Sequence, residues 1–301
     1  MAIYEVEGEQ LKLQVDSHGA ELKSLKDKKT NREYMWDADP QFWPRTSPVL
    51  FPFIGRIHEQ KYSYQGREYE ISPHGFARDT EFRVTEQTKA SITLEMEDSE
   101  ETRKAYPFTF VFRVTYALEN GLLRVSFQVK NKGSEKMYFS LGAHPGFFCP
   151  EKQNDSGSQK RSDCFLKLEG EKELKKIRCR DVNMDTGLVL DSYTEYELQD
   201  GFLSIADDLF KNDALVLEDH QVNRVSLCGA DRKPYLILSM DAPVYGIWSS
   251  VKPGSPFICI EPWFGRCDAQ KFRGTLEERE HQICLEGNEQ FATEYTVAFN
   301  L

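Results

Sequence analysis

The sequence predicts an all-β protein whose strands form a large antiparallel β-sandwich. At least seven segments alternate apolar and polar residues with a period of two, which is the pattern of a half-buried strand. Hardly any stretch shows the 3.6-residue period of an amphipathic helix. Clusters of turn residues separate the segments, as in sheets built from hairpins. We find no linker, so we expect one domain over residues 1–301.

The clearest hairpin joins residues 108–118 to residues 123–129, both of which alternate strictly. Between them, Glu119-Asn120-Gly121 provides the turn, because Asn and Gly tolerate the positive φ that a tight hairpin turn requires. Gln65-Gly66 predicts a second hairpin. We expect further strands at residues 11–15, 137–143, 222–227, 235–240, 244–248, 257–261 and 291–299.

Three segments do not fit a strand. The apolar run over residues 47–60 is interrupted by prolines, which cannot donate to a ladder, so we expect a loop packed on a sheet. Residues 151–161 are polar and predict an exposed loop. Residues 200–211 predict a short helix or an irregular turn.

Composition narrows the function. The net charge of −11 and the pI near 5.2 disfavour nucleic acid or an anionic membrane as a partner, and leave a small ligand open. No stretch approaches the length of a membrane span, and the N-terminus lacks the features of a signal peptide. The seven cysteines are scattered and form no C-x-x-C, which indicates reduced thiols in a cytoplasmic protein.

The segment MYFSLGAHPGFFC, residues 137–149, ends a predicted strand on a histidine followed by a proline. Its apolar residues alternate, so His144 belongs to the opposite face of the strand. Pro145 ends the ladder and favours extended geometry at His144. Such a histidine suits proton transfer at the mouth of a β cavity. A purely structural histidine at a strand end is the alternative.

Two other ionisable residues stand at the ends of apolar strands, His74 and Glu261. A carboxyl and an imidazole, with ordinary pKa values of about 4.3 and 6.5, make a workable base and acid near neutral pH. Arg56 and Asp213 could anchor hydroxyl groups by charge-assisted hydrogen bonds. Flat apolar surfaces on which a sugar ring could stack are expected from Phe76, Phe147, Trp248 and Trp263.

Four short motifs occur in a recognisable order. They are FPFIGR at residues 51–56, HGFAR at 74–78, GAHPGF at 142–147 and EPWFG at 261–265. Together they resemble the aldose 1-epimerase (galactose mutarotase-like) family, and most closely its LacX-type branch. The resemblance implies one β-supersandwich domain with an open groove that binds an aldose.

In that family the glutamate matching Glu261 takes the proton of the anomeric hydroxyl, and the histidine matching His144 protonates the ring oxygen. The ring opens, and closure on the other carbonyl face gives the opposite anomer. The residues matching His74 and Arg56 hold sugar oxygens, and an aspartate near Asp213 holds further hydroxyls. Arg78 and Trp263 lie within the motifs and are expected to contact the sugar. Because acid–base chemistry needs only these residue types, we expect no metal or organic cofactor, and the sequence leaves open a monomer or a homodimer.

The sequence leaves the substrate open between a free sugar and a sugar phosphate. Five arginines lie in or beside the motifs, and guanidinium groups suit phosphate geometry. These arginines could equally pair with the abundant carboxylates. They are Arg45, Arg56, Arg78, Arg266 and Arg273.

Three other functions compete with mutarotation. The same fold could bind a carbohydrate without turnover. Glycoside hydrolysis would need a second carboxyl beside Glu261, for which Asp213 is the candidate. A metal site of His74, His144 and Glu261 lacks the local ligand spacing that such sites usually show.

Overall fold

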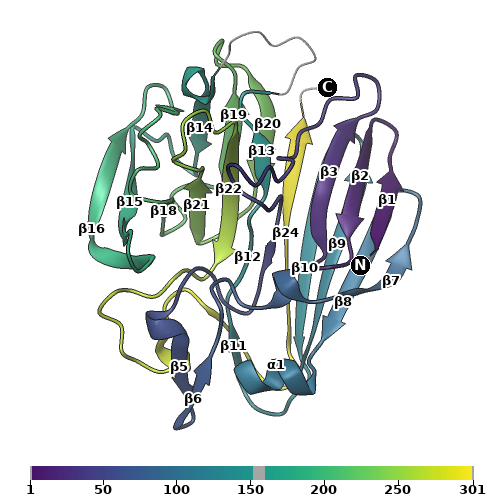
Figure 1. Cartoon of the computed structure of the whole chain (residues 1–301), viewed down its shortest axis with the longest axis vertical. Helices are drawn as coiled ribbons and strands as arrows, with labels where there is room; N and C mark the ends of the chain where they lie inside the picture. Colours follow the sequence, from purple (N-terminus) through teal and green to yellow (C-terminus); the bar gives the residue numbers. More distant parts are fainter. Residues whose placement is uncertain (1, 152–159, 300–301) are drawn as a thin grey trace.

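The computed structural model of the chain describes residues 2–151 and 160–299. It confirms the all-β prediction, because antiparallel strands make up almost all of the regular structure, in two large sheets and three small ones (Figure 1). The nine-stranded sheet has the spatial order β17 (Phe202–Ser204), β14 (Phe165–Glu169), β19 (Arg224–Cys228), β20 (Pro234–Ser239), β24 (Gln290–Phe299), β10 (Leu122–Asn131), β9 (Phe110–Glu119), β8 (Ser91–Glu97) and β7 (Arg83–Gln87).

The second large sheet has eight strands. Its order is β16 (Leu188–Glu197), β15 (Lys176–Asn183), β18 (Leu215–Leu217), β21 (Val244–Trp248), β22 (Phe257–Phe264), β12 (Leu141–Ala143) and β4 (Val49–Leu50), and β13 (Gly146–Phe148) also pairs with β22. The small sheets are β1–β2–β3 (Ile3–Glu7, Leu11–Asp16, Glu21–Asp27), β5–β6 (Lys61–Tyr64, Arg67–Glu70) and β11–β23 (Met137–Phe139, Ile283–Leu285).

Helices are few and short among the described residues. They are α1 (Glu100–Ala105) and four 3₁₀ turns, η1 (His58–Gln60), η2 (Ala77–Asp79), η3 (Arg161–Asp163) and η4 (Leu276–Glu278). None of the helices in residues 2–151 and 160–299 has the length and apolar character needed to span a membrane.

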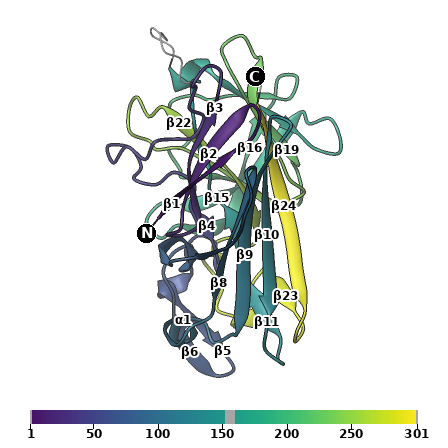
Figure 2. The ribbon, with the colours of Figure 1, turned by 90° about the vertical axis from the view of Figure 1, so that its right-hand side faces the viewer.

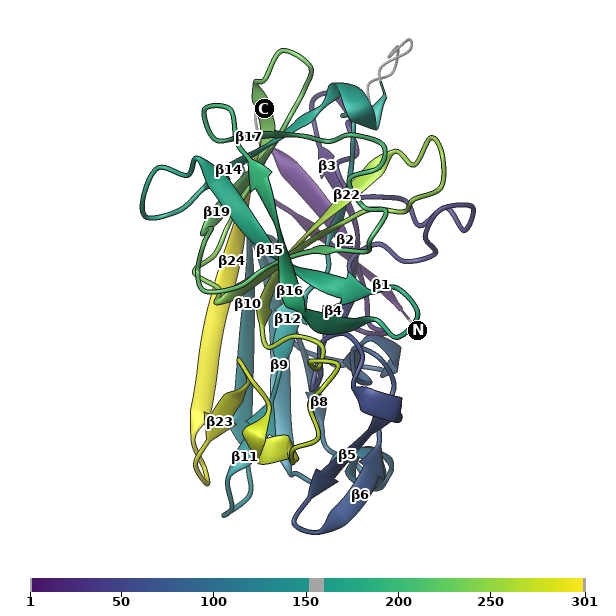
Figure 3. The ribbon, with the colours of Figure 1, turned by 90° about the vertical axis from the view of Figure 1, so that its left-hand side faces the viewer.

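Residue alternation divides the eight-stranded sheet into two faces. One face, with Ile258 and Ile260 on β22 and Ile247 on β21, joins the main apolar core shared with the nine-stranded sheet. The opposite face of β22 carries Cys259 and Glu261. The long strands β9, β10 and β24 run side by side (Figure 2), and β15 and β16 lie on the left of Figure 1, the side that faces the viewer in Figure 3. Because Ile258 and Ile260 pack into the core, Cys259 and Glu261 must point from the opposite face of β22.

The hairpin predicted around Asn120-Gly121 is confirmed. Strands β9 and β10 pair in register from Glu119–Leu122 onward, and Asn120 and Gly121 have φ values of 50° and 76°. The Gln65-Gly66 hairpin is confirmed as β5–β6. Residues 47–60 are mainly a buried loop as predicted, although Val49–Leu50 forms the short strand β4.

The single strand predicted over residues 137–143 is wrong in one respect. It breaks at Ser140 into β11 and β12, which pair with different strands. The backbone N–H of Ser140 donates to the carbonyl of Pro52 at 2.8 Å instead of to a neighbouring strand. Gly265 packs so closely on Ser140 that a Cβ there would lie 2.2 Å from the Ser140 hydroxyl. Tertiary contacts therefore override a local pattern that is continuous.

Other expectations need correction. Residues 200–211 contain no helix: they contain the strand β17, and residues 207–211 form the irregular turn that was the other alternative. Residues 152–159 of the predicted exposed loop lie outside the described residues, but its last member, Arg161, is buried and donates to Ser249 and Ser250. Helix α1 was not predicted from periodicity; its signal is the reciprocal Ser99–Thr102 capping box.

The loop that carries His74 passes very close to the backbone of Phe51. Gly75 has φ +73°, and a Cβ there would lie 2.2 Å from the carbonyl oxygen of Phe51. Gly66 has the same φ of +73°, but no atom lies within 4 Å of the position that a Cβ would take there. Comparing an alanine substitution at each glycine therefore distinguishes the free-energy cost of the backbone conformation from the cost of the steric clash with Phe51.

We expect Gly66→Ala to lower the free energy of unfolding by about 1–2 kcal/mol, the cost of a left-handed conformation for alanine. Gly75→Ala should lose about 1–3 kcal/mol more, because the methyl group also overpacks the loop. Urea denaturation of both variants tests this. Equal losses would show that the Phe51 contact imposes no constraint.

Candidate active site

A pocket of about 360 Å³ opens on the free face of the eight-stranded sheet. It collects side chains from strands and loops that are far apart in the sequence. Its lining consists of Trp43, Gly55, Arg56, His74, His144, Val182, Gly187, Asp213, Ala214, Val216, Trp248, Glu261, Trp263 and Cys267. Six of the seven residues predicted to act on a sugar therefore lie in one pocket, and the seventh, Arg78, does not line it.

Glu261 lies in the middle of β22, paired with Gly246 of β21, and only 1% of its surface is exposed. Burial raises the pKa of its carboxyl well above the ordinary value, and the negative charge of Asp213 raises it further. The Glu261 carboxyl therefore keeps its proton at a higher pH than a carboxyl in water does.

His144 follows β12 and is fixed by its backbone and by its neighbours. Its N–H donates to the Pro48 carbonyl at 3.2 Å, and the carbonyl of Pro145 accepts from Ile260 at 3.2 Å. The indole of Trp43 stacks on the imidazole, with ring centroids 4.8 Å apart and an interplanar angle of 26°. The predicted strand-end histidine is thus held in one orientation.

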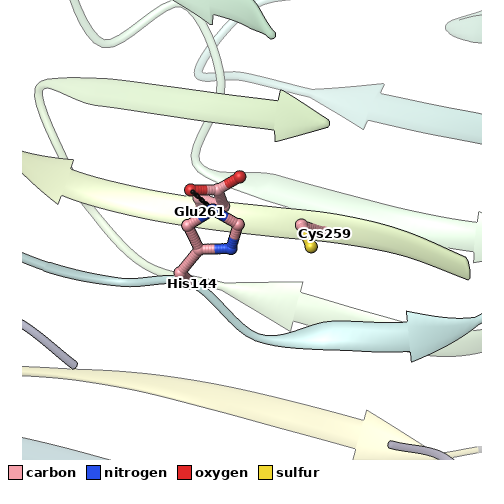
Figure 4. A group of neighbouring side chains, drawn as sticks. All are labelled: His144, Cys259 and Glu261. Atoms are coloured by element: carbon pink, nitrogen blue, oxygen red, sulfur yellow. Dashed lines mark ion pairs between the residues drawn. The ribbon is translucent and has the colours of Figure 1, made fainter. Parts of the chain in front are cut away.

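His144 and Glu261 meet directly. The imidazole Nε2 lies 3.2 Å from a carboxyl oxygen of Glu261 (Figure 4). The contact is close in distance but lacks hydrogen-bond alignment, since this Glu261 oxygen has no hydrogen-bond partner among the described residues. Burial lowers the pKa of His144 to about 3. Desolvation of both groups thus favours an uncharged pair in which Glu261 holds the proton.

His74 is held in a defined tautomer. Its Nδ1 accepts a hydrogen bond from the Gly55 N–H at 3.2 Å, which leaves Nε2 to carry the hydrogen. Burial lowers the pKa of His74 well below its ordinary value, and the positive charges of Arg78 and Arg45 act in the same direction. His74 is therefore a neutral donor at the pocket. Its φ of +67° is uncommon for a non-glycine residue.

Asp213 and Arg56 both line the pocket, and their opposite charges attract each other. Asp213 has φ +74°, and its carboxylate accepts from the Ala214 N–H at 2.8 Å. Burial raises the pKa of Asp213, and the Arg56 charge offsets part of that effect. Arg56 packs against Gly187, where a Cβ would lie 2.8 Å from its Cδ. Gly187 therefore leaves room for the arginine side chain at the pocket edge.

Trp263 occupies the sheet surface beside Glu261. Its indole lies over two glycines on flanking strands: a Cβ at Gly246 would come within 2.4 Å of the ring and a Cβ at Gly142 within 2.6 Å. The ring is only 6% exposed, so it forms part of the pocket floor. The glycines at these two positions are what allow a large aromatic ring to lie there.

Arg78 has a different place from the one predicted. Its guanidinium donates to the Pro73 carbonyl at 2.8 Å and pairs with Asp79, so it braces the segment that carries His74. Its carbonyl oxygen accepts from Arg45. Arg78 therefore affects the pocket in two ways. Its positive charge lowers the pKa of His74, and its hydrogen bond to Pro73 holds the loop that carries His74.

The stacking surfaces also differ from the prediction. Phe147 is buried in the core, and Phe76 packs against Phe51 and Tyr106, so neither lines the pocket. Trp248 does line it, and so does Trp43, which was not predicted from the sequence to belong to the site. The available signal for Trp43 was weak: a tryptophan in an irregular segment rich in Asp and Pro.

Buried acid–base groups in an open pocket define a protein equipped for proton transfer on a small polar ligand. The aldose 1-epimerase family model matches residues 3–278. The chain therefore belongs to the aldose 1-epimerase family, which confirms the resemblance seen in its motifs.

Relatives of known sequence and structure agree. The plasmid-encoded protein LacX of Lactococcus lactis subsp. lactis is 31% identical over 283 residues, which cover 91% of this chain and 92% of LacX. A galactose mutarotase related enzyme from Lactobacillus acidophilus is 35% identical with a TM-score of 0.90, covering 100% of this chain and 98% of that one. A galactose mutarotase-like protein from Lactobacillus casei is 27% identical with a TM-score of 0.89, covering 99% and 100%.

The burial of His144 predicts a specific acid sensitivity. Its folded pKa of about 3 lies below the ordinary 6.5, so its contribution to stability is fully present above pH 6.5 and is lost as the pH falls toward 3. Between pH 7 and pH 4 we expect the wild type to lose about 3 kcal/mol more unfolding free energy than His144→Asn, which cannot titrate there.

Urea denaturation at several pH values measures this difference. His220→Asn is the matched control, because that imidazole is largely exposed and lies outside the pocket; it should keep the wild-type pH dependence. Parallel pH profiles for the wild type and His144→Asn would show that the buried imidazole is not the acid-sensitive group.

Proposed function

We propose that this protein is an aldose mutarotase, which interconverts the α and β anomers of an aldohexose by acid–base ring opening. The observation that carries this proposal is the 3.2 Å contact between His144 and Glu261 inside the pocket. The anomeric hydroxyl and the ring oxygen of an aldose are bound to the same carbon. An acid and a base that serve both oxygens must therefore be close neighbours, as these two side chains are.

Ring opening needs a carboxylate base and an imidazolium acid. In the resting site desolvation favours the proton on Glu261, and its transfer to His144 across the contact produces the required pair. Glu261 then takes the anomeric proton while His144 protonates the ring oxygen, and the open aldehyde forms. Rotation about C1–C2 and the reverse proton transfers close the other anomer. The cycle returns both groups to their starting states.

The remaining pocket residues hold the sugar. His74 donates through Nε2, and Arg56 and Asp213 bind hydroxyl groups as charged donor and acceptor. Trp43 and Trp248, which are more exposed than Trp263, offer apolar faces to the sugar C–H groups. The pocket thus combines a few directed polar groups with aromatic walls, as small-ligand sites commonly do.

A sugar without a phosphate fits this pocket better than a sugar phosphate. Of the five arginines near the motifs, Arg56 alone lines the pocket. Arg45 and Arg78 pair with Asp79, while Arg266 is buried between Glu218 and Glu280. Arg273 donates to two backbone carbonyls. These contacts favour the salt-bridge interpretation over a phosphate-binding cluster.

We further propose that the chain acts as a single domain in the cytoplasm, as a monomer or homodimer, without nucleic acid or membrane partners. Its cysteines support a reducing compartment, since all seven are free thiols and six are buried; the exposed one is Cys284.

Saturation-transfer NMR of glucose and galactose tests the activity. The wild type should accelerate anomer exchange, and Glu261→Gln or His144→Asn should each lower the enzyme-dependent rate about 10²–10⁴-fold, the usual contribution of a general acid or base. His220→Asn should retain the wild-type rate.

Two results would contradict mutarotation. Sugar binding without any exchange by the wild type would identify a carbohydrate-binding protein of the same fold. Release of nitrophenol from nitrophenyl glycosides, lost in Asp213→Asn, would instead indicate hydrolysis by the two carboxyl groups of the pocket.

The substrate preference has its own test. In calorimetric titrations we expect glucose 6-phosphate to bind no more tightly than glucose, because the pocket lining offers one arginine and no cluster. A phosphate that tightens binding about tenfold or more, and whose effect disappears in Arg56→Met, would overturn this assignment.

A further inference from the structure

A thiol lies beside the proposed acid–base pair. Cys259 precedes Glu261 by two residues on β22, so both side chains leave the same face of the strand (Figure 4). The sulfur of Cys259, a ring nitrogen of His144 and a carboxyl oxygen of Glu261 all lie within 4.8 Å of one another. Cys259 is fully buried and does not line the pocket, so its sulfur sits behind the pair.

Two polar atoms of this group are buried without a hydrogen bond to any described residue, although one of them, a Glu261 oxygen, lies 3.2 Å from Nε2 of His144. Within residues 2–151 and 160–299, Nδ1 of His144 and one carboxyl oxygen of Glu261 accept or donate no hydrogen bond. Buried polar atoms in that condition are costly. A cation that accepted their lone pairs would remove the cost.

We propose that His144, Cys259 and Glu261 form a binding site for Zn²⁺ or a chemically similar divalent cation, in competition with the sugar. Imidazole, thiolate and carboxylate are the ligands that zinc takes in proteins, whereas Mg²⁺ and Ca²⁺ require oxygen ligands. A thiolate, a carboxylate and a neutral imidazole carry two negative charges together. A divalent cation therefore leaves the buried site neutral.

The geometry requires a modest adjustment. Ligand atoms around a tetrahedral zinc ion lie about 3.3–3.7 Å apart, as follows from the usual metal–ligand bond lengths. The widest separation must therefore close by about 1 Å, within reach of side-chain rotation. His144 and Glu261 line the pocket, so the fourth ligand of the metal would be a water molecule from the pocket.

Binding has a defined proton balance. The thiol of Cys259 and the carboxylic acid of Glu261 each give up one proton as the metal–sulfur and metal–oxygen bonds form, and His144 binds as neutral imidazole. The metal then occupies the Glu261 carboxylate that ring opening uses as its base, so the anomeric proton has no acceptor. Inhibition by the cation rests on the proposed mutarotase function, but cation binding does not.

Calorimetry with Zn²⁺ in buffers of different ionisation enthalpy tests the site. We expect one ion per chain with release of about two protons. Cys259→Ser should bind at least about tenfold more weakly and release one proton fewer. Cys228→Ser, a buried strand cysteine in the other large sheet, should behave as the wild type.

Co²⁺ gives an independent readout, because a cobalt–thiolate bond produces a charge-transfer absorption in the near ultraviolet. The band should appear in the wild type and be absent in Cys259→Ser and in Cys259→Ala. No band in the wild type, or Zn²⁺ affinity unchanged in both variants, would overturn the site.

Activity separates this site from the proposed function. Zn²⁺ should abolish anomer exchange by the wild type and weaken as an inhibitor when galactose is added, while Cys259→Ser should resist it. If the metal-free protein shows no exchange, mutarotation fails, but the calorimetric and cobalt results still decide the metal site. Exchange that persists at saturating Zn²⁺ would refute the competition.

Discussion

Removing the Glu261 carboxyl from water is the constraint on which the site depends. A carboxyl in the middle of a strand, fully buried in the sheet, retains its proton unless a partner compensates its charge. His144 lies 3.2 Å away but is itself desolvated, so the pair is uncharged and Glu261 keeps the proton. The same burial that shifts the two pKa values also lowers the stability of the fold, so packing elsewhere must compensate for the site.

Glycine residues, which have no side chain, shape the site as much as the larger residues do. Gly246 and Gly142 leave the sheet surface bare so that Trp263 can lie across it, and Gly187 leaves room for Arg56. Gly75 lets the loop carrying His74 pass against the Phe51 carbonyl. Glycine thus builds the pocket by allowing close approach, at positions where any larger residue would displace a functional group.

Much of the fold could be predicted because the alternation of β9, β10 and β24 is local, and because β22 begins as a continuous apolar run. The break at Ser140 could not, since it arises from Pro52 and Gly265, which are remote in sequence. Motif order pointed to His144 and Glu261, but Arg78 shows that a place in a motif does not assign a contact. Trp43 was missed because stacking on His144 is a tertiary property without a local pattern.

The acid–base pair joins β12 to β22, two strands that are neighbours in the sheet although a large part of the chain separates them. The segment from β13 to β21 forms the loop that the contact between His144 and Glu261 closes. Closing such a long loop is entropically costly and tends to occur late in folding. The appearance of the proposed activity during refolding would therefore report this long-range contact and not the formation of the local hairpins.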